Sequence, residues 1–124
     1  MNSHKNLFDV RPWGWYLTLY NTPTTKTKVI TVNPGESLST QYHNYRDEHW
    51  VIISGNGEVL VGQEASRVVS GSKIYIPNGT IHNASCSIEN NVPLVFIEVA
   101  ISTEKDKEVD EEDIARLEDK YGRQ

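Results

Sequence analysis

A glutamine, two histidines and a glutamate in this sequence are spaced so that they could share one metal ion. Gln41 and His43 alternate along a stretch that resembles a strand, which places both side chains on one face. Glu48 follows a short turn and can point to the same place from the next strand, and a later glycine-bounded stretch ends on His82. An amide oxygen, two imidazoles and a carboxylate make a plausible ligand set for a divalent metal, with positions left for water or substrate.

Three basic residues could bind an anionic group near this predicted centre. Lys26 and Lys28 share one parity of a predicted strand with Ile30 and Val32. If the two apolar residues face the interior of a barrel, the lysines point toward its mouth, where they could contact a phosphate. The alternative is an exposed edge with solvated lysines, because lysine is almost never buried unpaired. Arg46, which precedes the carboxylate of the centre, is a further candidate with the same alternative.

Seven short runs rich in Val, Ile, Thr and aromatic residues predict the strands that would position these side chains. The runs cover residues 15–20, 26–32, 50–53, 58–61, 67–69, 73–76 and 95–100. Turn-forming residues separate them, among them the glycine pair Gly55-Asn56-Gly57, which predicts a hairpin turn. So many strands in one small domain must close or stack to hide their edges. The sequence therefore predicts an all-β barrel over about residues 15–100.

The last part of the sequence has a different pattern. Residues 102–110 are mostly charged and predict a linker. Asp110 then offers a natural N-cap, and Glu112 could pair with Arg116 one turn on. Three apolar residues follow at i, i+3 and i+7, namely Ile114, Leu117 and Tyr121. These signals predict a short α-helix over about residues 111–120 that packs its apolar stripe on the β domain.

Composition limits the class of protein. The 124 residues, with a mass of 14.1 kDa, suit one domain, and the formal charge of -5 argues against a nucleic-acid partner. No apolar run approaches the roughly 20 residues of a membrane-spanning helix, so no membrane partner is expected. The lone Cys86 cannot form an internal disulfide, and the polar start lacks a signal-peptide pattern. We therefore expect a cytoplasmic protein.

Two glycine-framed motifs resemble the signatures of the cupin superfamily. They read Gly35-x5-Gln41-x-His43-x4-Glu48-x6-Gly55 and Gly71-x5-Pro77-x-Gly79-x2-His82. Within that superfamily the sequence is most similar to the C-terminal domain of type II mannose-6-phosphate isomerases, often fused to a mannose-1-phosphate guanylyltransferase. Four segments carry this likeness: Arg11-Pro12-Trp13-Gly14, Glu48-His49-Trp50, Tyr75-Ile76-Pro77-x-Gly79-Thr80 and Glu112-Asp113-Ile114-x-Arg116-x-Glu118-Asp119-x-Tyr121-Gly122.

The resemblance implies a cupin double-stranded β-helix, or jelly-roll barrel, with Gln41, His43, Glu48 and His82 as metal ligands. Zinc is the first expectation, with manganese, iron, cobalt and nickel as alternatives. Two positions depart from the family, because Tyr45 stands where a histidine is common and Cys86 where an asparagine is common. Neither is a predicted ligand, but both could alter a substrate pocket.

The implied activity is the interconversion of mannose 6-phosphate and fructose 6-phosphate. Such an isomerase needs a Lewis acid at the carbonyl and hydroxyl oxygens and a base for the carbon-bound proton. The residues leave the base open among Lys28, Glu36 and Glu98. The alternatives are a non-catalytic module that binds a phosphosugar or sugar nucleotide, and an iron-dependent cupin dioxygenase. A homodimer is also expected, because residues 50–53 and 95–99 are apolar on both strand parities.

Overall fold

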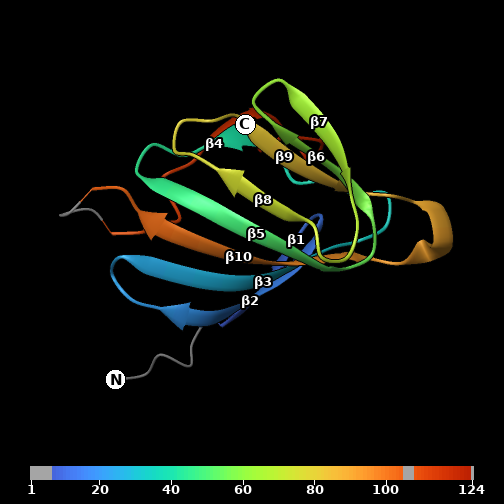
Figure 1. The fold of residues 1–124 in the computed structure, drawn as a ribbon, viewed down its shortest axis with the longest axis horizontal. Coiled ribbons are helices and arrows are strands. Elements are labelled where there is room, and N and C mark those ends of the chain that lie inside the picture. Colours follow the sequence, from blue (N-terminus) through green and yellow to red (C-terminus); the bar gives the residue numbers. More distant parts are fainter. Residues whose placement is uncertain (1–6, 105–107, 124) are drawn as a thin grey trace.

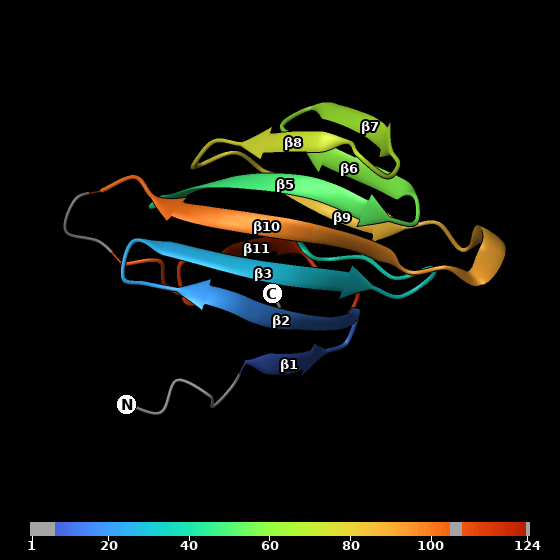
Figure 2. The ribbon, with the colours of Figure 1, turned by 60° about the horizontal axis from the view of Figure 1, so that its bottom comes forward.

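The computed structural model describes residues 7–104 and 108–123 as two antiparallel sheets (Figure 1). The six-stranded sheet has the order β1 (Phe8–Arg11), β2 (Gly14–Asn21), β3 (Thr25–Val32), β10 (Leu94–Ser102), β5 (Arg46–Ser54), β8 (Lys73–Ile76). The five-stranded sheet has the order β11 (Ala115–Glu118), β4 (Thr40–Tyr42), β9 (His82–Cys86), β6 (Gly57–Val61), β7 (Glu64–Val68). Figure 2 shows the first sheet lying in front of β9 and β11. The all-β prediction is confirmed.

Six of the seven predicted runs fall within strands, and the run 67–69 extends one residue beyond β7, which ends at Val68. The structure adds four further strands: β1, β4, β9 and β11. A short 3-10 turn, η1 (Glu89–Asn91), precedes β10. In the part of the chain that the structure describes, no helix has the length and apolar character needed to cross a membrane.

Strand β5 links the core to the candidate site. Its side chains alternate between the interior and the surface, so that Glu48, Trp50 and Ile52 are buried on one face while His49 and Val51 are exposed on the other. Trp50 stacks on the core residue Phe96 of β10 with ring centroids 4.5 Å apart. The same face of one strand therefore supplies aromatic packing in the middle and a carboxylate near its beginning.

The glycine pair Gly55-Asn56-Gly57 turns the chain from β5 into β6, but the turn is not the predicted hairpin, because β5 belongs to the six-stranded sheet and β6 to the five-stranded sheet. Gly55 has φ of +83°, in the left-handed region, and a Cβ there would lie 2.1 Å from the carbonyl oxygen of Pro93. A Cβ on Gly57 would lie 2.0 Å from the carbonyl oxygen of Ser85. Close backbone approach at both positions excludes any larger residue without movement of the chain.

The predicted α-helix over residues 111–120 is wrong. Asp110 does accept a hydrogen bond from the backbone N–H of Glu112, at 2.9 Å, but the result is a turn. The chain then enters β11, which pairs antiparallel with β4 and places Arg116 opposite Gln41. An isolated helix this short is marginal, whereas pairing satisfies the backbone of a strand that would otherwise be an open edge. Tertiary pairing therefore overrides the helical pattern.

The apolar residues of the expected helix have separate roles, and of them only Leu117 lies within β11. Tyr121 packs against the hydrophobic core, and Leu117 is 42% exposed. Gly122 has φ of +77°, as expected for a residue that ends a local element in the left-handed region. Just before the turn, Val109 is buried, and its N–H donates to the carbonyl oxygen of Pro23 at 3.0 Å. The last described segment is therefore attached to both sheets.

Candidate metal centre and the adjoining pocket

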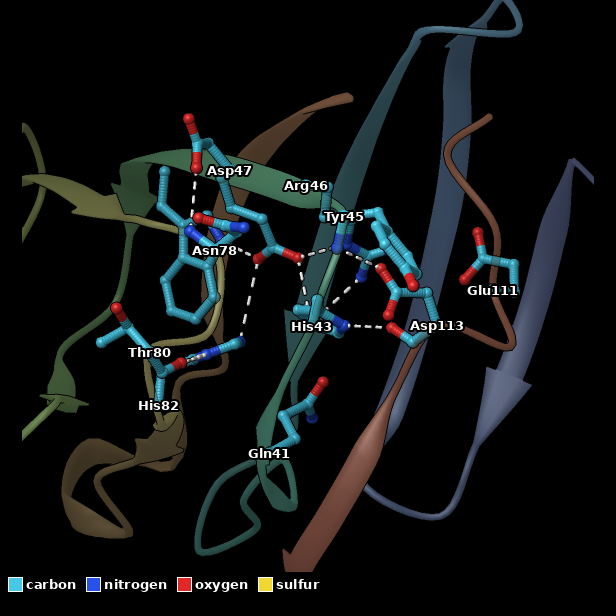
Figure 3. A network of polar contacts seen from close by, with 12 residues as sticks. Gln41, His43, Tyr45, Arg46, Asp47, Asn78, Thr80, His82, Glu111 and Asp113 are labelled. Carbon is cyan, nitrogen blue, oxygen red and sulfur yellow. Dashed lines mark hydrogen bonds and ion pairs between the residues drawn. The ribbon is translucent and has the colours of Figure 1, made fainter. Parts of the chain in front are cut away.

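Three buried donor side chains, His43, Glu48 and His82, meet between the two sheets. Figure 3 labels His43 and His82 in this group. Glu48 lies on β5, His82 is the first residue of β9, and His43 follows directly after β4. One possible ligand atom of each residue lies within 4.8 Å of the other two. The three residues are only 1 to 3% exposed. They are three of the four ligands that the sequence predicts.

Backbone carbonyl groups fix the tautomers of both imidazoles. His43 Nδ1 lies 2.6 Å from the carbonyl oxygen of Asp113, and His82 Nδ1 lies 2.9 Å from that of Thr80. A carbonyl oxygen can only accept, so each Nδ1 must carry a proton, and in the neutral ring Nε2 then carries the lone pair. The Nε2 atoms of His43 and His82 lie 3.2 and 3.9 Å from oxygens of Glu48. Orienting a ligand histidine in this way is typical of metal sites.

The charge states suit a cation. Burial lowers the pKa of His43 to about 4, so its imidazole is neutral at neutral pH. Burial opposes the ionisation of Glu48, but Arg46, His43 and His82 together lower its pKa to about 2. Trp50 Nε1 also donates to Glu48 Oε1 at 2.9 Å. With both rings in the neutral form, the centre presents one carboxylate and two imidazole lone pairs in a buried space.

Arg46 supplies the positive charge beside these donors. Its Nε donates to Glu48 Oε2 at 2.9 Å, and its Nη2 lies 3.2 Å from His43 Nε2, whose lone pair can accept. A buried carboxylate is costly unless a positive charge lies beside it. Neutral imidazole together with carboxylate is also a donor set that zinc and related divalent metals prefer. The residues present therefore fit a divalent metal, with Arg46 as the internal counter-ion.

Replacing Arg46 with methionine is expected to destabilise the metal-free protein. The change leaves the buried Glu48 carboxylate without its charged partner, which typically costs about 3 to 5 kcal/mol. Urea unfolding of the chelator-treated protein measures this loss, and saturating zinc or manganese should restore much of it. Arg67→Met, on the exposed strand β7, is the matched control. Equal unfolding midpoints for both variants would contradict the counter-ion role.

Gln41, the fourth predicted ligand, is placed beside the three donors but is not aimed at them. It pairs in register with His82 across β4 and β9, so both side chains lie on the same face. Its amide nitrogen donates to the backbone oxygen and the hydroxyl of Ser39, at 3.2 and 2.9 Å. These bonds leave the amide oxygen available as a ligand, and its role in a metal site stays a prediction.

A pocket opens next to this centre, and Gln41, Arg46 and Glu98 lie in its wall. Aromatic and apolar side chains form another part of the wall, among them Trp13, Tyr16 and Ile30. Glu98, on β10, is 6% exposed and hydrogen-bonds the Glu48 carboxylate. Burial raises the pKa of Glu98, and the Glu48 charge raises it further, to about 8. Of the three candidate bases, Glu98 is therefore a buried carboxyl group in the pocket wall that can both take up and release a proton near neutral pH.

The other candidates have partners of their own. Lys26 Nζ and Lys28 Nζ both lie within 2.9 Å of the Glu111 carboxylate. Glu36 accepts from the Tyr121 hydroxyl at 2.5 Å and pairs with Lys120 at 2.9 Å, outside the residues that line this pocket. The predicted phosphate contacts of Lys26, Lys28 and Arg46 stay predictions, and in this state each of the three already has a carboxylate partner.

Two residues that support the centre have no counterpart in the sequence prediction. Asp113 orients His43 through its backbone oxygen and accepts from the N–H groups of Asn44 and Tyr45 through its side chain. Glu111 holds both lysines. No local signal could have revealed these roles, since the partners lie about seventy or more positions away and the region carried a helical pattern.

Comparison with known proteins agrees with this arrangement. A family model described as "Mannose-6-phosphate isomerase C-terminal" matches residues 1–119. Mannose-1-phosphate guanylyltransferase ManC of Salmonella typhimurium is 38% identical over 122 residues, which cover 97% of this chain and 23% of that protein. Xanthan biosynthesis protein XanB of Xanthomonas campestris is 38% identical over 120 residues, which cover 97% and 24%. The chain spans about a quarter of the length of these relatives.

Among solved structures, a cupin-2 domain from Rhodospirillum rubrum superposes with a TM-score of 0.66 at 22% identity. The match covers 86% of this chain and 70% of that one. At this identity the likeness shows the fold alone, and it confirms the predicted cupin barrel.

Proposed function

The chain belongs to the mannose-6-phosphate isomerase C-terminal family, and we propose that it is a metal-dependent isomerase that interconverts mannose 6-phosphate and fructose 6-phosphate. The observation that carries the proposal is the buried group of His43, Glu48 and His82, set beside a pocket rich in basic side chains. His43, Glu48 and His82 would hold a divalent metal, with Gln41 as the fourth ligand. When bound, the metal would supply Lewis-acid polarisation of the sugar oxygens.

Glu98 is the residue we assign to proton transfer between carbon atoms C1 and C2 of the sugar. It lies in the wall of the same pocket as Gln41 and Arg46, within hydrogen-bonding reach of the centre. Lys28 and Glu36 are each held in an ion pair, which makes them poorer candidates. General acid–base catalysis requires reach to the reacting proton first, and Glu98 meets that requirement best.

The experiment that tests this function is a turnover assay on the purified chain. The protein is stripped with a chelator, reconstituted separately with zinc, manganese, iron, cobalt or nickel, and given mannose 6-phosphate. Formation of fructose 6-phosphate is the expected result. Binding of mannose 6-phosphate without turnover would refute the isomerase and support the binding module. Oxygen consumption by the iron-loaded protein would point to a dioxygenase.

We further propose that two copies pair through the outer face of the six-stranded sheet. Apolar residues form one cross-strand row on this face: Phe8, Leu17, Val29, Ile97 and Val51. Phe8 is 55% and Val51 39% exposed, and a broad apolar sheet face requires cover. We thus propose mannose 6-phosphate as the substrate, a pair of copies as the assembly and the cytoplasm as the location.

Sedimentation at micromolar concentration tests the pairing. The wild type should sediment with twice the 14.1 kDa mass of the chain, and Val51→Lys should shift it to the single mass. Ile88→Lys, at a position 76% exposed and outside the sheets, is the matched control and should leave the dimer intact. A wild-type species of 14.1 kDa alone would refute the dimer.

A further inference from the structure

Five basic side chains line the pocket beside the candidate metal centre, and four of them have carboxylate partners. Their nearest distances are 3.8 Å for Arg11–Asp9, 2.8 Å for Lys28–Glu111, 2.9 Å for Arg46–Glu48 and 2.8 Å for Arg123–Asp119. The fifth is Arg116, on β11. Its Nε is buried and has no hydrogen-bond partner among residues 7–104 and 108–123. A buried guanidinium donor without an acceptor is costly, so its presence in a pocket wall calls for an anionic occupant.

The strand register places Arg116 in line with the metal centre. Arg116 pairs with Gln41 across β11 and β4, and Gln41 pairs with His82 across β4 and β9. Directly paired residues in antiparallel strands project to the same side of the sheet. Neighbouring strands lie about 4.8 Å apart, so Arg116 and His82 are roughly 10 Å apart across the sheet. Gln41 stands between them.

We propose that Arg116 binds the phosphate group of a phosphosugar whose other end lies at the metal centre. This inference rests on the proposed function, and it names Arg116 as the residue that selects a phosphorylated over a free sugar. A guanidinium fork matches phosphate oxygens with two parallel hydrogen bonds. The spacing across two strands suits an open-chain hexose phosphate, with its carbonyl end near His82 and its phosphate at Arg116.

Other basic residues serve this role less well. A phosphate at Lys28 would have to displace Glu111, whose carboxylate contacts both lysines at 2.8 to 2.9 Å. The nearby lysines also lower the pKa of Glu111 to about 2, so this carboxylate remains charged. Arg123 is held through two nitrogens by Asp119. Among the five basic side chains that line this pocket, Arg116 is the one at which an incoming anion gains a bond without first breaking an ion pair within residues 7–104 and 108–123.

The test compares Arg116→Gln and Arg116→Lys with the wild type, and uses Arg67→Gln on the exposed strand β7 as the matched control. The metal-loaded proteins are titrated calorimetrically with mannose 6-phosphate, inorganic phosphate and mannose. Arg116→Gln should weaken binding of mannose 6-phosphate roughly 10- to 100-fold and leave binding of mannose unchanged. Arg116→Lys should fall between, because the charge remains while the fork is lost.

The melting temperature, measured with and without inorganic phosphate, is a second readout. A purely structural role of Arg116 would not produce the pattern expected here. Without ligand, Arg116→Gln should melt at or above the wild-type temperature, because it removes a buried donor that has no partner. Inorganic phosphate should raise the melting temperature of the wild type and of Arg67→Gln, but not that of Arg116→Gln. Equal affinity of wild type and Arg116→Gln for mannose 6-phosphate would overturn the inference.

The two proposals can fail separately. Turnover with an unchanged KM for mannose 6-phosphate in Arg116→Gln would retain the isomerase and refute the phosphate site. Binding of mannose 6-phosphate that depends on Arg116, without turnover, would support the phosphate site and refute the isomerase.

Discussion

Replacing His82 with alanine is expected to abolish divalent-metal binding, and with it turnover of mannose 6-phosphate, while the barrel stays folded. The imidazole donates Nδ1–H to the Thr80 carbonyl and points Nε2 at the centre, and alanine supplies no ligand in its place. Loss of an outer-shell partner typically costs 10- to 100-fold in metal affinity, so loss of a direct ligand should cost more than about 100-fold. His43→Ala should behave alike, whereas Gln41→Ala should weaken binding less, since an amide oxygen is a poorer donor that water can replace.

Metal content after dialysis, titration with zinc, and circular dichroism together measure this effect. His49→Ala is the matched control, because His49 follows Glu48 directly but is exposed and stacks on Tyr75. It should retain metal and activity. If the purified wild type neither carries nor takes up any ion, the metal assignment and the mechanism built on it are both wrong.

Glu98→Gln should lower turnover by about 10²- to 10⁴-fold, the usual contribution of a general acid–base group. Glutamine keeps the shape of the side chain and can still hydrogen-bond Glu48, so metal affinity and mannose 6-phosphate binding should change by only a few-fold. Steady-state kinetics and calorimetry on the same metal-loaded sample separate these quantities. Glu36→Gln, at the ion pair with Lys120, is the control and should keep wild-type turnover.

The opposite pattern would contradict the assignment. Full turnover in Glu98→Gln, together with loss in Lys28→Gln or Glu36→Gln, would transfer the proton-transfer role to one of those residues. Loss of metal binding in Glu98→Gln would instead show that Glu98 supports the centre and does not transfer the proton.

The strands and the placement of Gln41, His43 and Glu48 could be predicted because their signals are local, whereas His82 is assigned to the centre through its place in the second glycine-framed motif. Alternation along β5 places Glu48 and Trp50 on the inner face, and glycines at Gly55 and Gly57 mark the turn to β6. The strand β4 and the loop after it place Gln41 and His43 within three residues of each other. Each of these features depends on residues adjacent in sequence and on rules of strand geometry.

The support for the site could not be predicted, because it depends on contacts made across the chain. The apolar spacing of Ile114, Leu117 and Tyr121 fits a helix, in which Arg116 would face Glu112 at the surface. In β11 the same arginine lies in the pocket wall opposite Gln41. The period assigned to a segment decides which of its residues face the interior. Because the segment is assigned a helical period, the prediction places Arg116 at the surface and misses its position in the pocket wall.

The bond from His43 Nδ1 to the Asp113 carbonyl has a consequence for how this protein matures. The two residues are separated by 70 positions, and β11 joins β4 over a similar span. Long-range pairings form late, because the entropy of closing a long loop must be lost before their contacts are gained. During synthesis, a nascent chain that has reached β10 holds all three donors but lacks the group that orients His43. Tight capture of a metal ion is therefore expected only after β11 has left the ribosome and paired with β4.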